Sequence, residues 1–160
     1  MKQKLYLDTT IPSSYYDTSK PIRQIITQKW FENDSKEFEM YISAITIREI
    51  AKIKNITKKN NIEKLIIDYN MQLLEFNEES NKLAEEYMRK GAIPKTEPED
   101  AYHIAIAVVN NIESLASWNF SHIVSINPIR KIHEINNKLG YNIIEISSLE
   151  LFGGYKYGNV

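Results

Sequence analysis

The sequence contains no cysteine, and that absence removes several kinds of chemistry at once. Disulfide frameworks, zinc sites built on thiolates and thiol nucleophiles are all excluded. The lack of disulfides is compatible with a reducing compartment. Any catalytic or metal-binding chemistry in this chain must therefore use carboxylate, imidazole, amide or hydroxyl groups.

Glycine and long apolar runs are also scarce. Only 5 of the 160 residues are glycine, and no glycine-rich loop follows a strand-like segment. Dinucleotide-binding loops and P-loops that cradle phosphate are therefore excluded. No apolar segment approaches the ~18 residues that a membrane span needs, and no signal-peptide pattern is visible. We expect a cytoplasmic protein without membrane attachment.

The charge of the chain is nearly balanced, at -1. No strong overall field attracts nucleic acid, so any contact with RNA must come from a local basic patch or from metal ions. The candidate patch is a lysine cluster, although such a cluster is more often a solvated helix face: Lys52, Lys54, Lys58 and Lys59. The length and the 42% share of hydrophobic residues suit one folded domain with a single core.

Strand-like and helix-like segments alternate along the chain. Strands are predicted at residues 4–7, 38–43, 73–76, 114–118 and 142–146. Helices are predicted after Pro21, over the segment around Ile47, from a cap at Thr57, after Asn77, from Asp100 and over 128–139. This alternation predicts an α/β domain over residues 1–152, with a central parallel sheet of about five strands flanked by helices. Residues 153–160 are expected to form a mobile C-terminal tail.

Four oxygen-bearing side chains occupy comparable junctions between these elements: Asp8, Glu49, Asp100 and Asn119. Each also has a purely structural interpretation. Asp8 and Asn119 suit turns or caps, Glu49 could close a capping box with Thr46, and Asp100 would favour the positive end of its helix. Parallel strands, however, bring their carboxyl ends to one edge of a sheet, where ligands usually bind. There the four groups can converge into an oxygen-rich site of the kind that Mg²⁺ and Mn²⁺ prefer.

Four segments together resemble a known family. They are residues 6–13 (YLDTTIPS), 43–50 (SAITIREI), 100–107 (DAYHIAIA) and 117–120 (SWNF). Their order and content resemble the PIN-domain ribonucleases of the VapC-like toxin type. The resemblance implies a parallel sheet flanked by helices, Mg²⁺ or Mn²⁺ as cofactor and RNA as substrate. It also implies a cognate antitoxin partner and a homodimer.

The resemblance also assigns residues. Asp8, Glu49 and Asp100 match the three core acids of the family, with Asp8 and Asp100 as metal ligands. Glu49 would bind the metal, directly or through water, or orient the attacking water. Asn119 falls where a fourth acid is common, and Ser121 where a further acid sometimes lies. Both departures remove negative charge, which should weaken binding of a second metal ion.

Further polar side chains surround these positions. Thr9 and Thr46 are expected to supply hydroxyl groups behind the metal ligands. His103 lies one turn beyond Asp100, where it would contact the substrate or serve as a hydrogen-bonded structural histidine. The tyrosines at positions 15 and 16 would stack on RNA bases, contact an antitoxin or pack in the core.

Two competing functions are distinguishable from the sequence. A haloacid-dehalogenase-like phosphatase needs a second acid two residues after the first, and that position is Thr10. The stronger rival is a catalytically degenerate PIN-like module that binds antitoxin or RNA without cutting it. Asn119 and Ser121 are compatible with that alternative.

Overall fold

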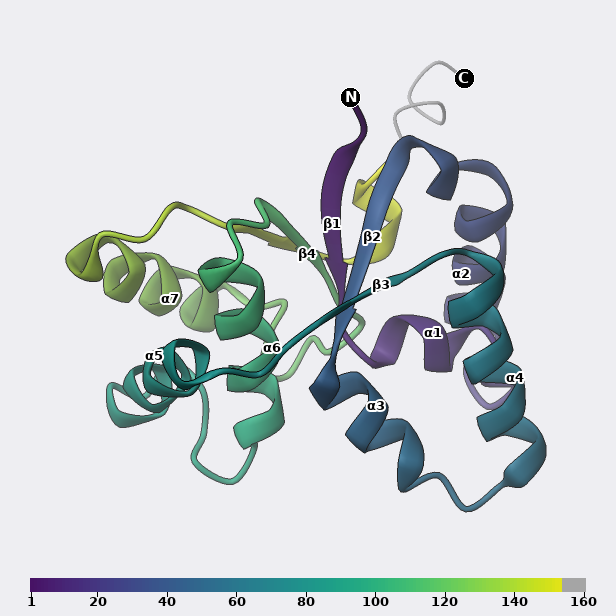
Figure 1. The fold of residues 1–160 in the computed structure, drawn as a ribbon, viewed down its shortest axis with the longest axis horizontal. Coiled ribbons are helices and arrows are strands. Elements are labelled where there is room, and N and C mark those ends of the chain that lie inside the picture. Colours follow the sequence, from purple (N-terminus) through teal and green to yellow (C-terminus); the bar gives the residue numbers. More distant parts are fainter. Residues whose placement is uncertain (154–160) are drawn as a thin grey trace.

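A computed structural model describes residues 1–153 of the chain. Within them, five strands form an all-parallel sheet with the order β3-β2-β1-β4-β5, and seven α-helices flank it (Figure 1). The predicted α/β class and five-stranded parallel sheet are confirmed. In chain order the elements are β1 (Gln3–Leu7), α1 (Thr10–Ser14), α2 (Pro21–Asn33), η1 (Ser35–Glu37), β2 (Phe38–Ser43), α3 (Ala44–Ala51), α4 (Ile56–Asp68), β3 (Gln72–Leu74), α5 (Glu78–Arg89), α6 (Pro98–Val109), β4 (Ser114–Ala116), α7 (Ile126–Leu139), β5 (Glu145–Ser147) and η2 (Leu149–Leu151).

The first strand of the chain lies in the middle of the sheet. Leu5 of β1 stands opposite Met40 of β2 on one side and Ser114 of β4 on the other. All five strands run in the same direction, so their carboxyl ends share one edge. Asp8 follows the last residue of β1 directly and therefore lies at the centre of that edge.

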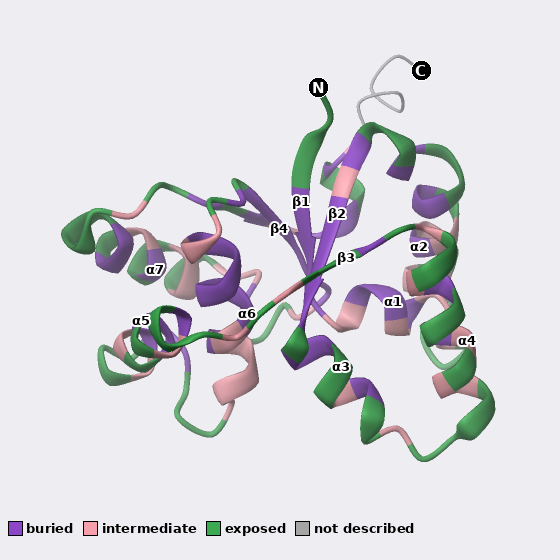
Figure 2. Cartoon of the chain, viewed as in Figure 1, coloured by how far each residue is buried: buried purple, intermediate pink, exposed green. Residues whose placement is uncertain are grey.

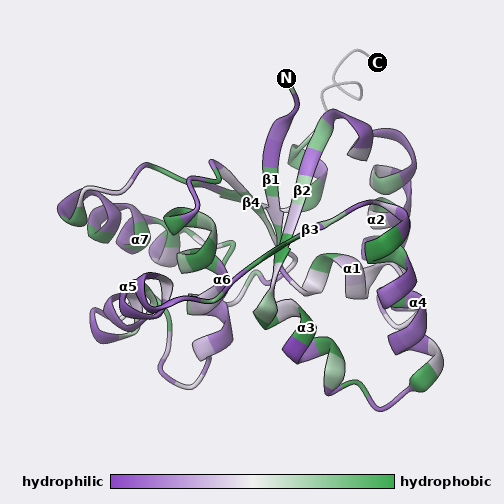
Figure 3. Ribbon diagram, viewed as in Figure 1, coloured by the Kyte–Doolittle hydropathy of each residue, from purple (hydrophilic) through white to green (hydrophobic). Residues whose placement is uncertain are grey.

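The two faces of the sheet carry separate hydrophobic cores, as expected when helices cover both sides of parallel strands. Tyr6 of β1 points into a core built with α5, α6 and α7. Its neighbours Leu5 and Leu7 point into the opposite core, built with α1, α2 and α4. Figure 2 shows the resulting buried centre, and Figure 3 shows hydrophilic residues along the outer surfaces of the helices. Full burial of such side chains contributes about 1.5–3 kcal/mol each.

Several element boundaries differ from the sequence prediction. Helix α6 begins at Pro98 rather than Asp100, because proline is well suited to the first helical position. Helix α4 is capped by Asn55, whose side chain accepts a hydrogen bond from the Lys58 amide, and not by Thr57. The outer strands β3 and β5 are three residues long and shifted by one to three residues from their predicted starts.

Helix α2 forms after Pro21, as predicted, but two of its isoleucines do not face the core. Ile22 is 75% exposed and Ile25 is 52% exposed. The buried face consists of Thr27, Trp30 and Phe31. The helix itself was predictable from the sequence, but the face that it buries was not.

The segment after β5 returns to this helix. The Trp30 indole donates a hydrogen bond of 2.6 Å to the Phe152 carbonyl oxygen, which ties η2 to α2. Apart from Gly153, the tail predicted over 153–160 lies outside the described residues. No helix within residues 1–153 is long and apolar enough to cross a membrane.

Candidate functional site

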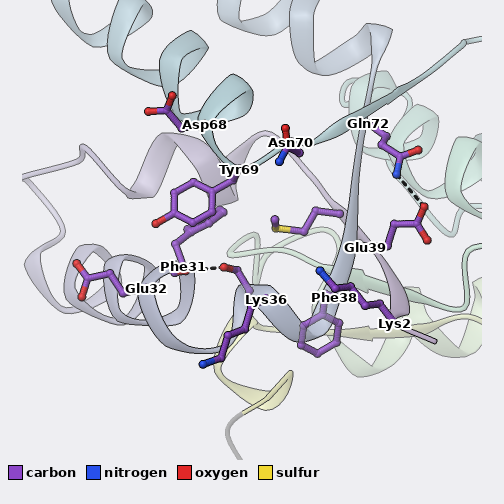
Figure 4. Close-up of a pocket in the computed structure, with 12 residues that line it drawn as sticks. Lys2, Phe31, Glu32, Lys36, Phe38, Glu39, Asp68, Tyr69, Asn70 and Gln72 are labelled. Carbon is purple, nitrogen blue, oxygen red and sulfur yellow. Dashed lines mark hydrogen bonds between the residues drawn. The ribbon is translucent and has the colours of Figure 1, made fainter.

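A hollow of about 420 Å³ lies away from the predicted acids (Figure 4). Phe38, the first residue of β2, lines it, so the hollow lies at the amino-terminal edge of the sheet. Its polar groups partly satisfy each other, as shown by the 2.7 Å hydrogen bond from Gln72 to Glu39 (Figure 4). Asp8 follows the carboxyl end of β1, so the acids and this hollow occupy opposite edges of the sheet.

Asp8 is 2% exposed and is held by hydrogen bonds to both carboxylate oxygens. Its Oδ1 accepts from the Thr10 amide at 3.1 Å and from the Thr10 hydroxyl. Its Oδ2 accepts from the hydroxyl of Ser117, which follows β4 by one residue. Burial raises the pKa of Asp8, although the charge of His103 and these hydroxyl contacts oppose the shift. The side chain is therefore fixed in direction, in surroundings whose burial disfavours its charged form.

Asp100 lies in the first turn of α6, where the helix dipole favours a negative charge. Its Oδ2 accepts a 3.1 Å hydrogen bond from Asn119 Nδ2 and lies 3.3 Å from His122 Nδ1. Burial, and next the negative charge of Asp8, raise the pKa of Asp100 to about 6. The two carboxyl groups thus repel each other across the edge of the sheet, as clustered carboxylates do without a cation.

Asn119 has both ends of its amide engaged. Its Oδ1 accepts hydrogen bonds from the backbone amides of Ser121 at 3.1 Å and His122 at 3.0 Å. Those two N–H donors fix the orientation of the amide, so Nδ2 faces Asp100. Asn119 both caps its turn, as the structural interpretation has it, and contacts a site acid.

Glu49 is partnered by a histidine. Its Oε1 accepts a 2.7 Å hydrogen bond from the Thr9 hydroxyl and lies 2.6 Å from His103 Nε2. A carboxylate only accepts, so the His103 proton on Nε2 points at Glu49. Burial works to raise the pKa of Glu49, but the hydrogen bond and charge of His103, with Thr9, hold it below its ordinary value.

A chain of buried hydrogen bonds positions His103. Its Nδ1 lies 2.6 Å from the Tyr6 hydroxyl, which in turn hydrogen-bonds to Ser43 Oγ at 2.8 Å. His103 is 2% exposed and Tyr6 and Ser43 are fully buried. The structural alternative for His103, a hydrogen-bonded buried histidine, describes this geometry, and the ring directly orients Glu49.

The capping box that the sequence places at Thr46 is arranged differently. Ser43 is the N-cap of α3, and its backbone amide donates a hydrogen bond to the Thr46 hydroxyl oxygen. Glu49 takes no part in that cap, which leaves its carboxylate to Thr9 and His103. Thr46 is fully buried and serves the helix end. Ser121 is exposed, and its backbone amide, not its hydroxyl, contacts Asn119.

Two side chains outside the predicted set lie beside Asp100. One ligand atom each of Glu97, Asp100 and His122 lie within 4.8 Å of one another. Ser117 was missed as well, because its contact with Asp8 joins residues 109 positions apart. For His122 the available signal was its position three residues after Asn119. Within residues 1–153 this trio is the group of acids and histidines whose ligand atoms lie close enough to share one ion. Asp8 is not part of it and acts on Asp100 through its charge.

Comparison with known proteins places this geometry in a family. A family model described as PIN domain matches residues 5–119. The chain belongs to the PIN-domain family. The matched region contains Asp8, Glu49, Asp100 and Asn119. A search of the curated proteins gave no match.

Three of the solved structures that share the fold show the extent of the similarity. VapBC2 from Rickettsia felis, bound to a DNA fragment from its promoter, is 14% identical, with 91% of this chain and 98% of that chain covered and a TM-score of 0.54. VapC20 from Mycobacterium tuberculosis, a toxin that cleaves the sarcin-ricin loop, is 9% identical, with 88% and 98% covered and a TM-score of 0.57. VapBC-1 from nontypeable Haemophilus influenzae is 16% identical, with 92% and 98% covered and a TM-score of 0.57.

Proposed function

We propose that this chain is a divalent-metal-dependent ribonuclease, with Mg²⁺ or Mn²⁺ as its cofactor. The observation that carries the proposal is the convergence of Asp8 and Asp100 at one sheet edge, where the charge of Asp8 helps to raise the pKa of Asp100. Two carboxyl groups that repel each other suit a cation between them. Oxygen donors, with one imidazole nearby, match the ligand preferences of Mg²⁺ and Mn²⁺.

The residues that would hold the ion are Asp8 and Asp100, with Glu97 and His122 beside Asp100. A bound divalent ion supplies Lewis acidity toward a phosphate oxygen and lowers the pKa of water. Thr10 and Ser117 keep the Asp8 carboxylate in place. The amide of Asn119 does the same for Asp100. This support lets the carboxylates keep their direction when charge develops on the substrate.

Glu49 is the group best suited to orient a water molecule. Its lowered pKa keeps it ionised at neutral pH, and Oε2 accepts no hydrogen bond from other groups within residues 1–153. Its side chain is 31% exposed, so solvent reaches it. His103 and Thr9 fix Oε1, which leaves Oε2 to accept a hydrogen bond from the attacking water.

The experiment that tests the enzyme is cleavage of structured and single-stranded RNA in Mn²⁺, Mg²⁺ or EDTA. Asp8→Asn is expected to abolish metal-dependent cleavage while the fold persists, because asparagine keeps the shape and removes a buried charge. The matched control is Asp68→Asn on α4, a carboxylate that pairs with Lys64 on the exposed surface. Undiminished cleavage by Asp8→Asn would overturn the assignment and point to a contaminating nuclease.

We further propose that the protein is the toxin of a toxin-antitoxin pair and acts in the cytoplasm as a homodimer. Support comes from the shared fold with structures named as VapBC complexes. Co-expression with the product of an adjacent small gene, followed by co-purification and a cleavage assay, tests this. We expect the antitoxin to co-purify with the chain and to suppress its cleavage of RNA.

A binding module without activity is the second candidate. Asn119 and Ser121 favour it, because both stand where an additional carboxylate would strengthen metal binding. Such a module binds RNA or antitoxin but neither cuts RNA nor gains stability from Mn²⁺. Metal-induced stabilisation therefore separates the two functions before any substrate is known.

A further inference from the structure

The loop after β4 joins the two site carboxylates to an exposed aromatic ring. The Trp118 amide donates a 2.8 Å hydrogen bond to Thr10 Oγ1, and Thr10 also holds Asp8. Asn119, the next residue, donates to Asp100. Phe120 follows at once, and its amide donates to the Trp118 carbonyl oxygen at 3.1 Å. The backbone that carries Phe120 is thus fixed to both sides of the site.

Phe120 is 46% exposed, although it belongs to a loop that packs closely elsewhere. The neighbouring Trp118 ring is 3% exposed and lies 6.2 Å from Phe120 in an edge-to-face contact. The Arg23 guanidinium of α2 lies 5.2 Å from the centroid of the Phe120 ring and 5.8 Å from that of Trp118. Arg23 therefore supports Phe120 through a cation-π contact.

Hydrogen bonds also link the main chain of Arg23 to Trp118. The Trp118 indole donates a 3.0 Å hydrogen bond to Thr27 Oγ1, and that hydroxyl donates to the Arg23 carbonyl oxygen at 2.6 Å. No carboxylate within residues 1–153 forms an ion pair with Arg23. A partly exposed positive charge, with no ion-pair partner in the described part of the chain, thus lies next to an exposed ring at one end of an acidic site.

We propose that Phe120 is a stacking platform for an unpaired base next to the scissile bond, and that Arg23 binds an adjacent phosphate. This inference rests on the proposed ribonuclease function. Aromatic side chains stack on any base, and arginine combines cation-π contact with charge for the backbone. Bases within a duplex have no free face to offer. The platform therefore selects RNA with an unpaired nucleotide at the cleavage point.

The test measures RNA binding in the Asp8→Asn background, so that no cleavage occurs. The probe is a fluorescein-labelled single strand of about 12 nucleotides, alone or annealed to its complement, followed by fluorescence anisotropy. Phe120→Leu is expected to weaken single-strand binding by about tenfold, and Phe120→Trp to retain it. Duplex binding is expected to be weak and indifferent to these changes.

Arg23→Gln is expected to lower the slope of log affinity against log salt by about 0.7, the value for one phosphate contact on a single strand. Arg130→Gln, an exposed arginine on α7, is the matched control and is expected to bind like its parent. In the active protein, Phe120→Leu is expected to raise KM for single-stranded RNA and to leave kcat nearly unchanged.

The possible outcomes test the stacking role of Phe120 separately from the proposed ribonuclease activity. Metal-dependent cleavage with equal RNA affinity in wild-type protein and Phe120→Leu overturns the platform alone. No binding and no cleavage of any RNA by the wild-type protein overturns both. Unchanged RNA affinity with loss of antitoxin binding in Phe120→Leu would assign the ring to a protein interface and likewise overturn the platform.

Discussion

Asp8 and Asp100 each stand in an environment that disfavours their charged form. Burial and the charge of Asp8 raise the pKa of Asp100 to about 6, and burial raises the pKa of Asp8. A carboxyl group with a raised pKa in the folded state destabilises the protein once it ionises. The site therefore holds its acids at a cost in folding free energy, which a bound cation would offset.

The first prediction concerns Asp100→Asn in EDTA. The stabilisation from protonated Asp100 is fully present below pH 3.8 and is lost as pH rises through about 6. The variant has no such loss, and its amide oxygen still accepts from Asn119. We expect it to melt at a higher temperature than wild type at neutral pH, with the difference closing as pH falls toward 3.8. Equal melting curves above pH 6 would contradict the raised pKa of Asp100.

The second prediction concerns the hydroxyl of Tyr6. Tyr6→Phe leaves the buried His103 Nδ1 without its partner and removes one of the two donors to Ser43 Oγ. That change costs about 1–3 kcal/mol of stability and loosens the ring that orients Glu49. We expect a lower urea midpoint and a lower kcat. Tyr87→Phe is the matched control, because Tyr87 is equally buried and its hydroxyl bonds Asn136. It is expected to lose stability and keep kcat.

The sequence allowed us to predict which residues lie at the ends of the strands, but not which side chains from different strands contact each other. Asp8, Glu49, Asp100 and Asn119 were visible because the alternation of elements places them at one edge. The hydroxyl of Ser117 gave no such signal, because only the pairing of β1 with β4 brings it to Asp8. The roles of the four predicted residues in catalysis stay predictions.

At the scale of elements, α3 is the helix whose start matters most to the site. Its N-cap Ser43 and Thr46 exchange hydrogen bonds, which fixes the first turn from which Glu49 projects one turn later. The same Ser43 hydroxyl meets Tyr6. One residue thus couples the position of a helix to the orientation of a catalytic candidate.

The third prediction is that Ser43→Ala lowers both stability and cleavage. Loss of an N-cap costs about 1 kcal/mol, and the Tyr6 hydroxyl also loses one of its two buried partners while it keeps His103. Asn55→Ala removes the side-chain cap of α4 and is the matched control. Chemical denaturation should show a loss in both variants, and cleavage should fall in Ser43→Ala alone. Equal cleavage by the two variants would separate α3 from the chemistry.

The type and order of the helices and strands were predictable from the sequence, but their first and last residues were less so. The helix predicted over 128–139 forms, and Gly140 ends α7 in the left-handed conformation that glycine favours. The predicted start of α4 was wrong: the cap is Asn55, two residues before Thr57, and asparagine is the somewhat better N-cap of the two. The exposed face of α2 could not be predicted, since helical spacing gives a period but not the direction of the sheet.

At the scale of the whole molecule, the fourth prediction is stabilisation by metal. Binding to the folded state alone adds about 2.7 kcal/mol at a hundredfold excess over Kd, or a rise of roughly 5–10 °C in Tm for a chain of this size. Thermal melting with Mn²⁺ is expected to show that rise in wild type and in Asp68→Asn, and not in Asp8→Asn. A flat response to millimolar Mn²⁺ in wild type would favour the binding module.

The central place of β1 has a consequence for how the molecule comes into being. The strand that is synthesised first pairs with residues 38–41 and with residues 114–116, and the hydroxyl that holds Asp8 arrives at position 117. A chain still growing on the ribosome therefore has no complete site until most of it has emerged, and the long loop closure delays its assembly. A nuclease with this topology would be unable to cleave its own messenger RNA or the ribosomal RNA around it until its translation is nearly complete.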